Sequence, residues 1–395
     1  MRDPLSKKIT GIAPSGIRKF FDIVSEMPDA ISLGVGEPDF DTPWRVREEG
    51  IYTLEKGRTF YTSNAGLKEL RQEISNYLDR KIHVRYDYVH EVMVTVGGSE
   101  GIDLTMRAML NPGDEVLVPE PSYVSYAPCV TLADGVPVPI PMKEENEFKL
   151  TAEELEAAIT PKTKILVLPF PNNPTGAVWS RETIRAIGEW AVEHHVWVIS
   201  DEIYEHLNYD DAKTAYVGVE VPECRDQLLV LNGVAKTYAM PGWRVGWMVA
   251  PAPVAKAVAK LQGHLSSNVS NVPQRAALAA VAGSLDEVHM MRESFDARRK
   301  AIVAALNDIP GVHCPTPTGA FYAFPDVTGL LGKPLGENGT VVNTSSELAA
   351  ALLDEAHVAA VPGEAFGAPG YLRFSYALAD DQLAEGMRRF RRWVG

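Results

Sequence analysis

Lys236 and Arg244 stand eight positions apart in a stretch rich in small residues that runs from Asn232 to Gly246. The mainly apolar run before it, residues 227–231, has the composition of a buried strand. Most lysines are solvated on a helix surface, but a lysine at the mouth of a buried strand loses part of its hydration. Desolvation and a cationic neighbour lower the pKa of a lysine amine and free it to attack a carbonyl carbon. The stretch therefore predicts a Schiff-base lysine beside an anion site.

Two further apolar runs end in polar residues. Asp201 follows residues 196–199, and a carboxylate at this point must be paired, either as a helix N-cap or with a ligand. Asn173 follows residues 164–170 and precedes a proline, which by itself indicates only a turn. These two residues are candidates for a site, and structural roles remain open for both.

A third run, residues 91–96, leads into Gly98, Ser99 and Glu100 at the predicted start of a helix. Backbone amides at a helix N-terminus with a hydroxyl beside them form an anion site, and Arg244 would strengthen it. The carboxylate of Glu100 would repel a phosphate there. We therefore expect the Glu100 side chain to point away from the anion.

Two motifs carry a family resemblance. The pattern Gly-x-Ala-Lys-x-x-Ala-Met-x-Gly-x-Arg-Val-Gly at 233–246 and the string Asn-Asn-Pro-Thr-Gly at 172–176 resemble class I aminotransferases, which are fold-type I enzymes dependent on pyridoxal phosphate (PLP). The residues that match the family's functional positions occur in family order along nearly the whole chain: Gly36, Tyr61, Gly98, Ser99, Tyr123, Asn173, Asp201, Tyr204, Lys236, Arg244 and Arg373.

The resemblance implies roles around the cofactor ring. Lys236 would form the Schiff base with PLP and move the substrate α-proton, as general base and then as general acid. Asp201 would pair with the protonated ring nitrogen, and Tyr123 would stack on the ring. Tyr204 and Asn173 would face the phenolic oxygen. The implied catalytic residues are Lys236, Asp201 and Tyr204.

The resemblance also implies sites for the phosphate and the substrate. Gly98–Ser99 and Arg244 would bind the phosphate, and Tyr61 would reach the phosphate of a neighbouring subunit, so that a homodimer shares its two active sites. Gly36, Asn173 and Arg373 would bind the substrate carboxylate. An ordinary salt bridge is the alternative for Arg373, because an unpaired guanidinium inside an apolar strand is unfavourable.

Bulk composition restricts the classes of partner. The 395 residues include 38 basic and 52 acidic ones, and the net charge of −14 disfavours binding to nucleic acid or to an anionic membrane. Three widely spaced cysteines suggest neither a disulfide framework nor a zinc site, and no metal is expected. No signal sequence and no apolar run of about 20 residues is present, which favours a cytoplasmic protein.

Strand and helix patterns alternate between residues 91 and 203, which indicates a mainly parallel sheet covered by helices in an α/β fold. The resemblance extends this to a seven-stranded sheet in a large PLP-binding domain, residues 45–285. The pattern of strands and helices changes in residues 286–395. Together with residues 1–44, they are expected to form a smaller α/β domain. An amphipathic segment at 16–23 belongs to this N-terminal part.

The predicted function is amino-group transfer between an L-amino acid and a 2-oxo acid such as 2-oxoglutarate. The sequence does not decide whether the amino donor is an aromatic amino acid, aspartate or a broad range of amino acids. The chain also resembles N-acetyl-diaminopimelate aminotransferases. A PLP-dependent carbon–sulfur lyase is an alternative with the same residues. A PLP-sensing regulator would need a DNA-binding domain for which the chain has no spare length. A nicotinamide enzyme is disfavoured because no Gly-x-Gly-x-x-Gly follows the early strands.

Overall fold

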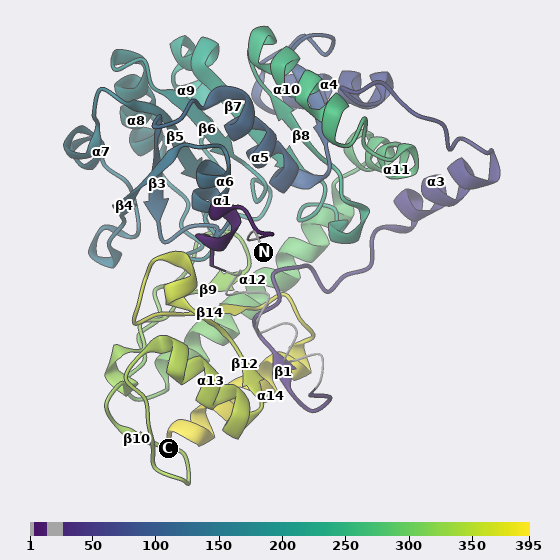
Figure 1. Cartoon of the computed structure of the whole chain (residues 1–395). Helices are drawn as coiled ribbons and strands as arrows, with labels where there is room; N and C mark the ends of the chain where they lie inside the picture. Colours follow the sequence, from purple (N-terminus) through teal and green to yellow (C-terminus); the bar gives the residue numbers. More distant parts are fainter. Residues whose placement is uncertain (1–3, 14–26) are drawn as a thin grey trace.

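A computed structural model describes residues 4–13 and 27–395 and shows one large sheet with helices on both faces (Figure 1). The strand order is β2-β8-β7-β6-β5-β3-β4. Strand β8 runs antiparallel to both of its neighbours, and the remaining pairs are parallel, so the expected mainly parallel seven-stranded sheet is confirmed. The strands are β2 Val92–Thr95, β3 Glu115–Glu120, β4 Val136–Pro141, β5 Thr163–Pro169, β6 Trp197–Asp201, β7 Leu228–Gly233 and β8 Gly246–Val249.

The central strands are apolar along their whole length because helices cover both faces of the sheet. In β5, Ile165 and Val167 enter one buried cluster, whereas Leu166 and Leu168 enter the other. The helices of this part are α3 Trp44–Glu55, α4 Lys68–Ile82, α5 Gly97–Met109, α6 Tyr126–Leu132, α7 Ala152–Ala158, α8 Arg181–Glu193, α9 Val217–Glu220, α10 Ala252–Leu265 and α11 Asn271–Ala282, with 3-10 turns η1 Glu144–Asn146, η2 Pro222–Gln227 and η3 Pro241–Trp243.

The long helix α12, Asp286–Asn307, leads into a second group of elements that lies below the large sheet in Figure 1. A three-stranded antiparallel sheet has the order β13-β14-β9. Its strands and neighbours are β9 Tyr322–Ala323, η4 Thr328–Leu330, β10 Pro334–Leu335, β11 Thr340–Val341, α13 Ser345–Ala356, β12 Val358–Ala359, β13 Val361–Pro362, η5 Gly363–Phe366, β14 Leu372–Ser375 and α14 Asp380–Val394.

The N-terminal part of the chain joins this second group. Strand β1, Ile31–Ser32, pairs in parallel with β12, and a short helix, α1 Lys7–Thr10, precedes it along the chain. The amphipathic segment predicted at 16–23 lies outside the described residues. Among residues 4–13 and 27–395, no helix combines the length and the apolar composition needed to cross a bilayer.

A buried carboxylate ties the ends of β6 and β7 together. Glu205 Oε1 accepts hydrogen bonds from Tyr77 Oη at 2.5 Å and Asn232 Nδ2 at 2.8 Å. Its Oε2 lies 2.7 Å from Lys81 Nζ and accepts from Tyr216 Oη at 3.1 Å. Burial alone raises the pKa of Glu205, but its neighbours, with Lys81 first, outweigh burial and lower it to about 2. The loop after β6 is therefore held by an ionised, fully hydrogen-bonded side chain.

We predict that Glu205→Gln lowers the free energy of unfolding by about 3–5 kcal/mol, because the buried Lys81 ammonium loses its counter-charge. Glu385→Gln on α14 is the control, because its ion pairs with Arg388 and Arg389 are screened by solvent and their loss should destabilise the protein far less. Urea denaturation measures both.

The pH dependence follows from the lowered pKa. Since the folded-state pKa of Glu205 lies below its ordinary value of 4.5, its contribution is present above pH 4.5 and is lost as the pH falls toward 2. Equal losses in Glu205→Gln and Glu385→Gln, or a Glu205→Gln protein with unchanged acid stability, would contradict this account.

Candidate active site

Lys236 lies in the loop that follows β7, next to the segment that leaves β1. Its Nζ donates a hydrogen bond to the backbone carbonyl of Gly36 at 2.5 Å, and the side chain is half-buried. Burial lowers the pKa of the amine to about 8; Glu37 opposes this shift, whereas Arg373 and Arg244 add to it. An appreciable fraction of the amine is thus unprotonated and nucleophilic near neutral pH.

Asp201 is the last residue of β6, and turns rather than a helix follow it, so the N-cap alternative is wrong. Its Oδ2 accepts a hydrogen bond from Tyr126 Oη at 2.7 Å, and Oδ1 accepts one from the backbone N–H of Ile203 at 3.3 Å. Burial raises the pKa of this carboxyl, and the two hydrogen bonds oppose the shift. The sequence analysis did not single out Tyr126, because its contact with Asp201 spans 75 positions.

Arg373 on β14 is almost completely buried and is held by neutral oxygens. Nη1 donates to Asn173 Oδ1 at 2.9 Å and Nη2 donates to the carbonyl of Gly34 at 2.7 Å, while Nε has no partner within the described part of the chain. The guanidinium carbon lies 4.5 Å from the ring centroid of Tyr322, whose hydroxyl is 2.8 Å from that of Tyr204. The sequence analysis did not single out Tyr322, which carries no motif signal within its apolar run.

Two arginines of the site lack an acidic partner. Within residues 4–13 and 27–395, no carboxylate lies within 4.0 Å of a guanidinium nitrogen of Arg373 or Arg244. The salt-bridge alternative for Arg373 is therefore wrong. Burial lowers the pKa of Arg373, as expected for a charge without a counter-ion. A buried cation with a free Nε–H is suited to binding an anionic group from outside the chain.

The start of α5 and Arg244 come together. A Cβ placed on Gly97 would lie 2.6 Å from Arg244 Nη2, whereas a Cβ on Gly98 would meet no atom within 4 Å. Ser99 is exposed, and its Oγ is 3.4 Å from Tyr123 Oη. The first amides of a helix have no intrahelical partner, so this corner offers N–H groups, a hydroxyl and a guanidinium to an anion.

The Glu100 side chain, in the first turn of α5, points toward α10. Glu100 Oε2 accepts from the backbone N–H of Val96 at 2.5 Å and from Gln262 Nε2 at 3.1 Å, and its Oε1 accepts from Ser266 Oγ at 3.0 Å. The expectation that Glu100 points away from the anion agrees with these contacts. The carboxylate caps the end of β2 and anchors α10.

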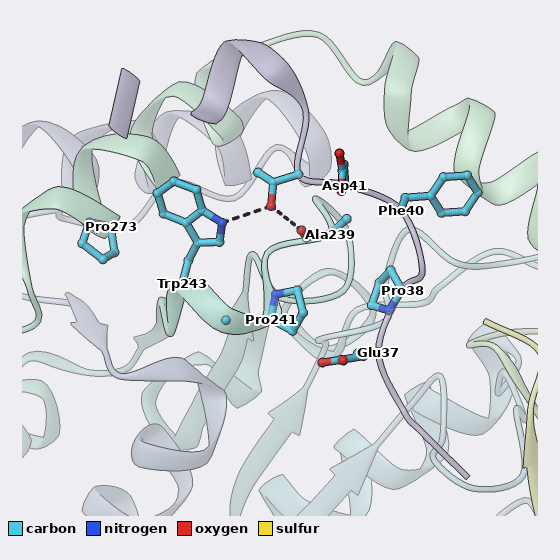
Figure 2. Close-up of a pocket in the computed structure, with 10 residues that line it drawn as sticks. Glu37, Pro38, Phe40, Asp41, Ala239, Pro241, Trp243 and Pro273 are labelled. Atoms are coloured by element: carbon cyan, nitrogen blue, oxygen red, sulfur yellow. Dashed lines mark hydrogen bonds between the residues drawn. The ribbon is translucent and has the colours of Figure 1, made fainter. Parts of the chain in front are cut away.

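The segment 37–42 passes beside the loop 239–243, and side chains of both segments face each other in Figure 2. Thr42 Oγ1 donates to the carbonyl of Ala239 at 2.6 Å and accepts from Trp243 Nε1 at 3.0 Å. A pocket of about 460 Å³ lies between the two segments. These bonds fix the segment that carries Gly36 against the loop between Lys236 and Arg244.

Tyr61 stands apart from these residues in its own chain. It is 90% exposed, its neighbour Phe60 is 80% exposed, and it lines a separate surface pocket with Arg58 and Arg275. The structure thus brings together the residues predicted around Lys236, including Asn173, Tyr204 and Arg373, and leaves Tyr61 facing outward.

Comparison with known families decides the class of protein. The family model described as "Aminotransferase class I and II" matches residues 28–390. The chain belongs to this family. It is an aminotransferase with the fold-type I architecture that the resemblance predicted, rather than a nicotinamide enzyme or a PLP-sensing regulator. Class I and II aminotransferases are generally dependent on PLP.

Individual relatives of this aminotransferase carry more specific names. An aspartate aminotransferase of Streptomyces avermitilis is 50% identical over 363 residues, which are 92% of this chain and 88% of the relative. The crystal structure of an aspartate aminotransferase from Rhizobium meliloti matches with a TM-score of 0.95 at 37% identity, covering 100% of this chain and 99% of the other. An aromatic aminotransferase structure from Pyrococcus horikoshii matches with a TM-score of 0.86 at 39% identity, covering 94% and 98%.

We predict that Gly36→Ala damages the site, because the added Cβ would lie 2.5 Å from Tyr322 Oη and must displace either the ring or the segment 37–42. Strain of this size lowers the unfolding free energy by about 1–3 kcal/mol, and kcat/KM should fall by more than tenfold. Gly242→Ala is the matched control in the neighbouring loop, since its Cβ would meet nothing within 4 Å. A Gly36→Ala enzyme as active and stable as Gly242→Ala would show that Gly36 is not in close contact.

Proposed function

We propose that this aminotransferase transfers amino groups between an aromatic amino acid, aspartate or a broader range of L-amino acids and a 2-oxo acid such as 2-oxoglutarate, with Lys236 as the attachment residue for PLP. One observation carries the proposal. The Lys236 amine donates a hydrogen bond to a backbone carbonyl, and burial lowers its pKa to about 8. Arg373 and Arg244, which have no acidic partner among the described residues, lie close enough to add to that shift.

The residues present fit PLP on chemical grounds. The start of α5, with Gly98, Ser99 and Arg244, offers donors to the phosphate, and the open space beside Gly98 leaves its amide accessible. Tyr123 would lie against the ring, next to Ser99. When bound, the cofactor supplies a reactive carbonyl carbon and an electron-withdrawing ring.

Asp201 is suited to hold a proton on the ring nitrogen. Its carboxyl is buried with a raised pKa, and its described partners are the neutral Tyr126 hydroxyl and a backbone amide. A cationic N–H would offset the burial of the charge and stabilise the ionised carboxylate. Tyr204 and Asn173 would face the phenolic oxygen, where each can donate a hydrogen bond.

Lys236 performs the proton transfers in this proposal. Its amine takes the substrate α-proton as general base and returns it as general acid, and a pKa near 8 suits both directions near neutral pH. Arg373 binds the α-carboxylate in a charge-assisted pair, with Asn173 and the backbone of Gly36 beside it. The proton-transfer residue and the carboxylate site are thus held by different parts of the chain.

We further propose residues 45–285 as the cofactor-binding domain and residues 1–44 with 286–395 as the smaller domain. Tyr61 would complete the phosphate site of a second subunit in a homodimer. Large exposed side chains on α3 and the loop after it support this interface: Trp44 and Leu54 are each more than half exposed, and Phe60 more so. Exposed apolar side chains that gather into a patch are a mark of protein–protein interfaces.

We predict that Lys236→Ala lowers transamination by at least about a thousandfold, because the amine proposed to move the α-proton is lost. The protein should still bind PLP weakly through Arg244 and the start of α5, since those contacts do not use the amine. Lys256→Ala on the exposed face of α10 is the control and should behave like the wild type. Turnover and the visible absorption band are the measurements; wild-type values for both in Lys236→Ala would refute the assignment.

We predict that Asp201→Asn keeps the fold and the hydrogen bond from Tyr126 but slows the half-reaction by about a hundredfold or more. The neutral amide cannot hold a proton on the ring nitrogen. Single-turnover kinetics with an amino acid measure the effect, and Asp103→Asn on α5 is the control. A rate within about tenfold of the wild type, equivalent to ~1.4 kcal/mol of barrier, would show that Asp201 only stabilises the end of β6.

Substrate range follows from an absence in the sequence. Residues 260–269 contain no arginine at the point where aspartate aminotransferases of the best-known subgroup are expected to bind the side-chain carboxylate. We predict that phenylalanine and tyrosine are used at least as well as aspartate, with 2-oxoglutarate as the common acceptor, because an unpaired carboxylate loses affinity in a desolvated pocket.

The test is kcat/KM for phenylalanine, tyrosine, aspartate and alanine with 2-oxoglutarate. N-acetyl-diaminopimelate should be included as a donor, and product analysis would reveal carbon–sulfur lyase activity. A preference of a hundredfold or more for aspartate over phenylalanine would contradict the prediction and require a cation from another part of the chain or from a second subunit.

A further inference from the structure

Tyr322 is the side chain that links the carboxylate site to the cofactor site. It lies on β9, paired with Ser375 of β14, and is 1% exposed. Its ring contacts the guanidinium of Arg373 and its hydroxyl contacts that of Tyr204. These two partners are the proposed ligands of different groups, the substrate carboxylate and the phenolic oxygen of PLP.

The ring of Tyr322 fixes one face of the Arg373 guanidinium. The guanidinium carbon is 4.5 Å from the ring centroid, and Phe366 lies at 5.0 Å from it. Together with the bonds to Asn173 and Gly34, this contact leaves the guanidinium little freedom. A cation that no carboxylate orients needs such neutral partners, because aromatic faces and carbonyl oxygens attract it without neutralising it.

The hydroxyl of Tyr322 is hydrogen-bonded to that of Tyr204, and either one can donate. The two oxygens are 2.8 Å apart, and the rings meet edge to face at 78°. A hydroxyl has one proton, so Tyr204 can donate to Tyr322 or to a ligand, but not fully to both. When Tyr204 donates to a ligand, the Tyr322 hydroxyl can donate to Tyr204 and strengthen it as a donor.

We propose that Tyr322 is a positioning residue that sets both Arg373 and Tyr204 and thereby couples the substrate-carboxylate site to the hydrogen bond at the cofactor. The proposal rests on the proposed function, since it assumes that Arg373 and Tyr204 bind these groups. Gly36 adds a third constraint: a Cβ there would lie 2.5 Å from Tyr322 Oη, so the segment leaving β1 packs directly on this hydroxyl.

Two substitutions separate the two contacts of Tyr322. Tyr322→Phe keeps the ring under Arg373 and removes the hydroxyl, whereas Tyr322→Leu removes both. Tyr376→Phe is the matched control, because this tyrosine is equally buried and its hydroxyl donates to the carbonyl of Ala320 in the same part of the fold. The thermal midpoint of each holoenzyme reports any general loss of stability.

Two readouts that do not depend on turnover are measured on these holoenzymes. The first is the pH midpoint of the visible absorption band of the bound cofactor. The second is the dissociation constant of 3-phenylpropionate, a carboxylate without an amino group, by calorimetry. In Tyr322→Phe the pH midpoint should rise by about half a unit, because Tyr204 becomes a weaker donor and leaves more negative charge on the oxygen that it binds. The affinity for 3-phenylpropionate should stay within about twofold, since the ring remains.

Tyr322→Leu should show the same midpoint shift and, in addition, bind 3-phenylpropionate about fivefold to tenfold more weakly. Tyr376→Phe should change neither quantity. An unshifted pH midpoint in Tyr322→Phe would overturn the proposal even if Tyr322→Leu does not fold. Wild-type affinity in a folded Tyr322→Leu, or equal changes in Tyr376→Phe, would also overturn it. A wild-type holoenzyme without the band, or without affinity for 3-phenylpropionate, would instead refute the proposed function.

Discussion

The site depends on positive charges that form no salt bridge with the described residues 4–13 and 27–395. Arg373 is buried against neutral oxygens and an aromatic ring, and Lys236 is half-buried against a backbone carbonyl. Such an arrangement is unfavourable for the protein alone, because desolvated cations are normally paired. It becomes favourable when anionic ligands enter. Under the proposed function, these unpaired cations favour the binding of a substrate carboxylate and keep part of the Lys236 amine unprotonated near neutral pH, at the expense of folding stability.

The fold makes this arrangement possible by stabilising the surroundings. Apolar strands buried on both faces place Asp201 at the end of β6 and Lys236 just beyond the end of β7. Glu205, fully satisfied and ionised, holds the loop after β6 to Asn232 at the end of β7. The segment that leaves β1 then brings Gly36 across the site. Rigid elements thus place the reactive groups, while the charges that remain unpaired are those that ligands are proposed to meet.

Sequence patterns predicted most of what is local. The long apolar strands and the capping of α7 by Thr151 and Glu154 follow from periodicity and cap chemistry, and the structure contains them. Short strands are less predictable: the apolar pattern of residues 319–324 is typical of a longer strand, but β9 is confined to Tyr322–Ala323, because pairing with β14 decides its length.

The contacts that the sequence did not predict join residues that are far apart in the chain. Tyr126 reaches Asp201, and Tyr322 joins Tyr204 to Arg373, yet neither tyrosine differs in type or spacing from a core residue. The N-cap expected as an alternative at Asp201 and the salt bridge considered for Arg373 are each absent among the described residues, because turns follow β6 and neutral groups surround the guanidinium. The composition and hydrophobic periodicity of a sequence do not show which distant side chains come into contact in the folded chain.

The central claim is that Lys236 carries the cofactor. The most direct measurement is borohydride reduction of the holoenzyme followed by proteolysis and mass spectrometry. The account predicts bleaching of the visible band and a phosphopyridoxyl group on the peptide that contains Lys236, with no other lysine modified to a comparable extent. Modification of a different lysine, or a protein that retains no cofactor to reduce, would contradict it.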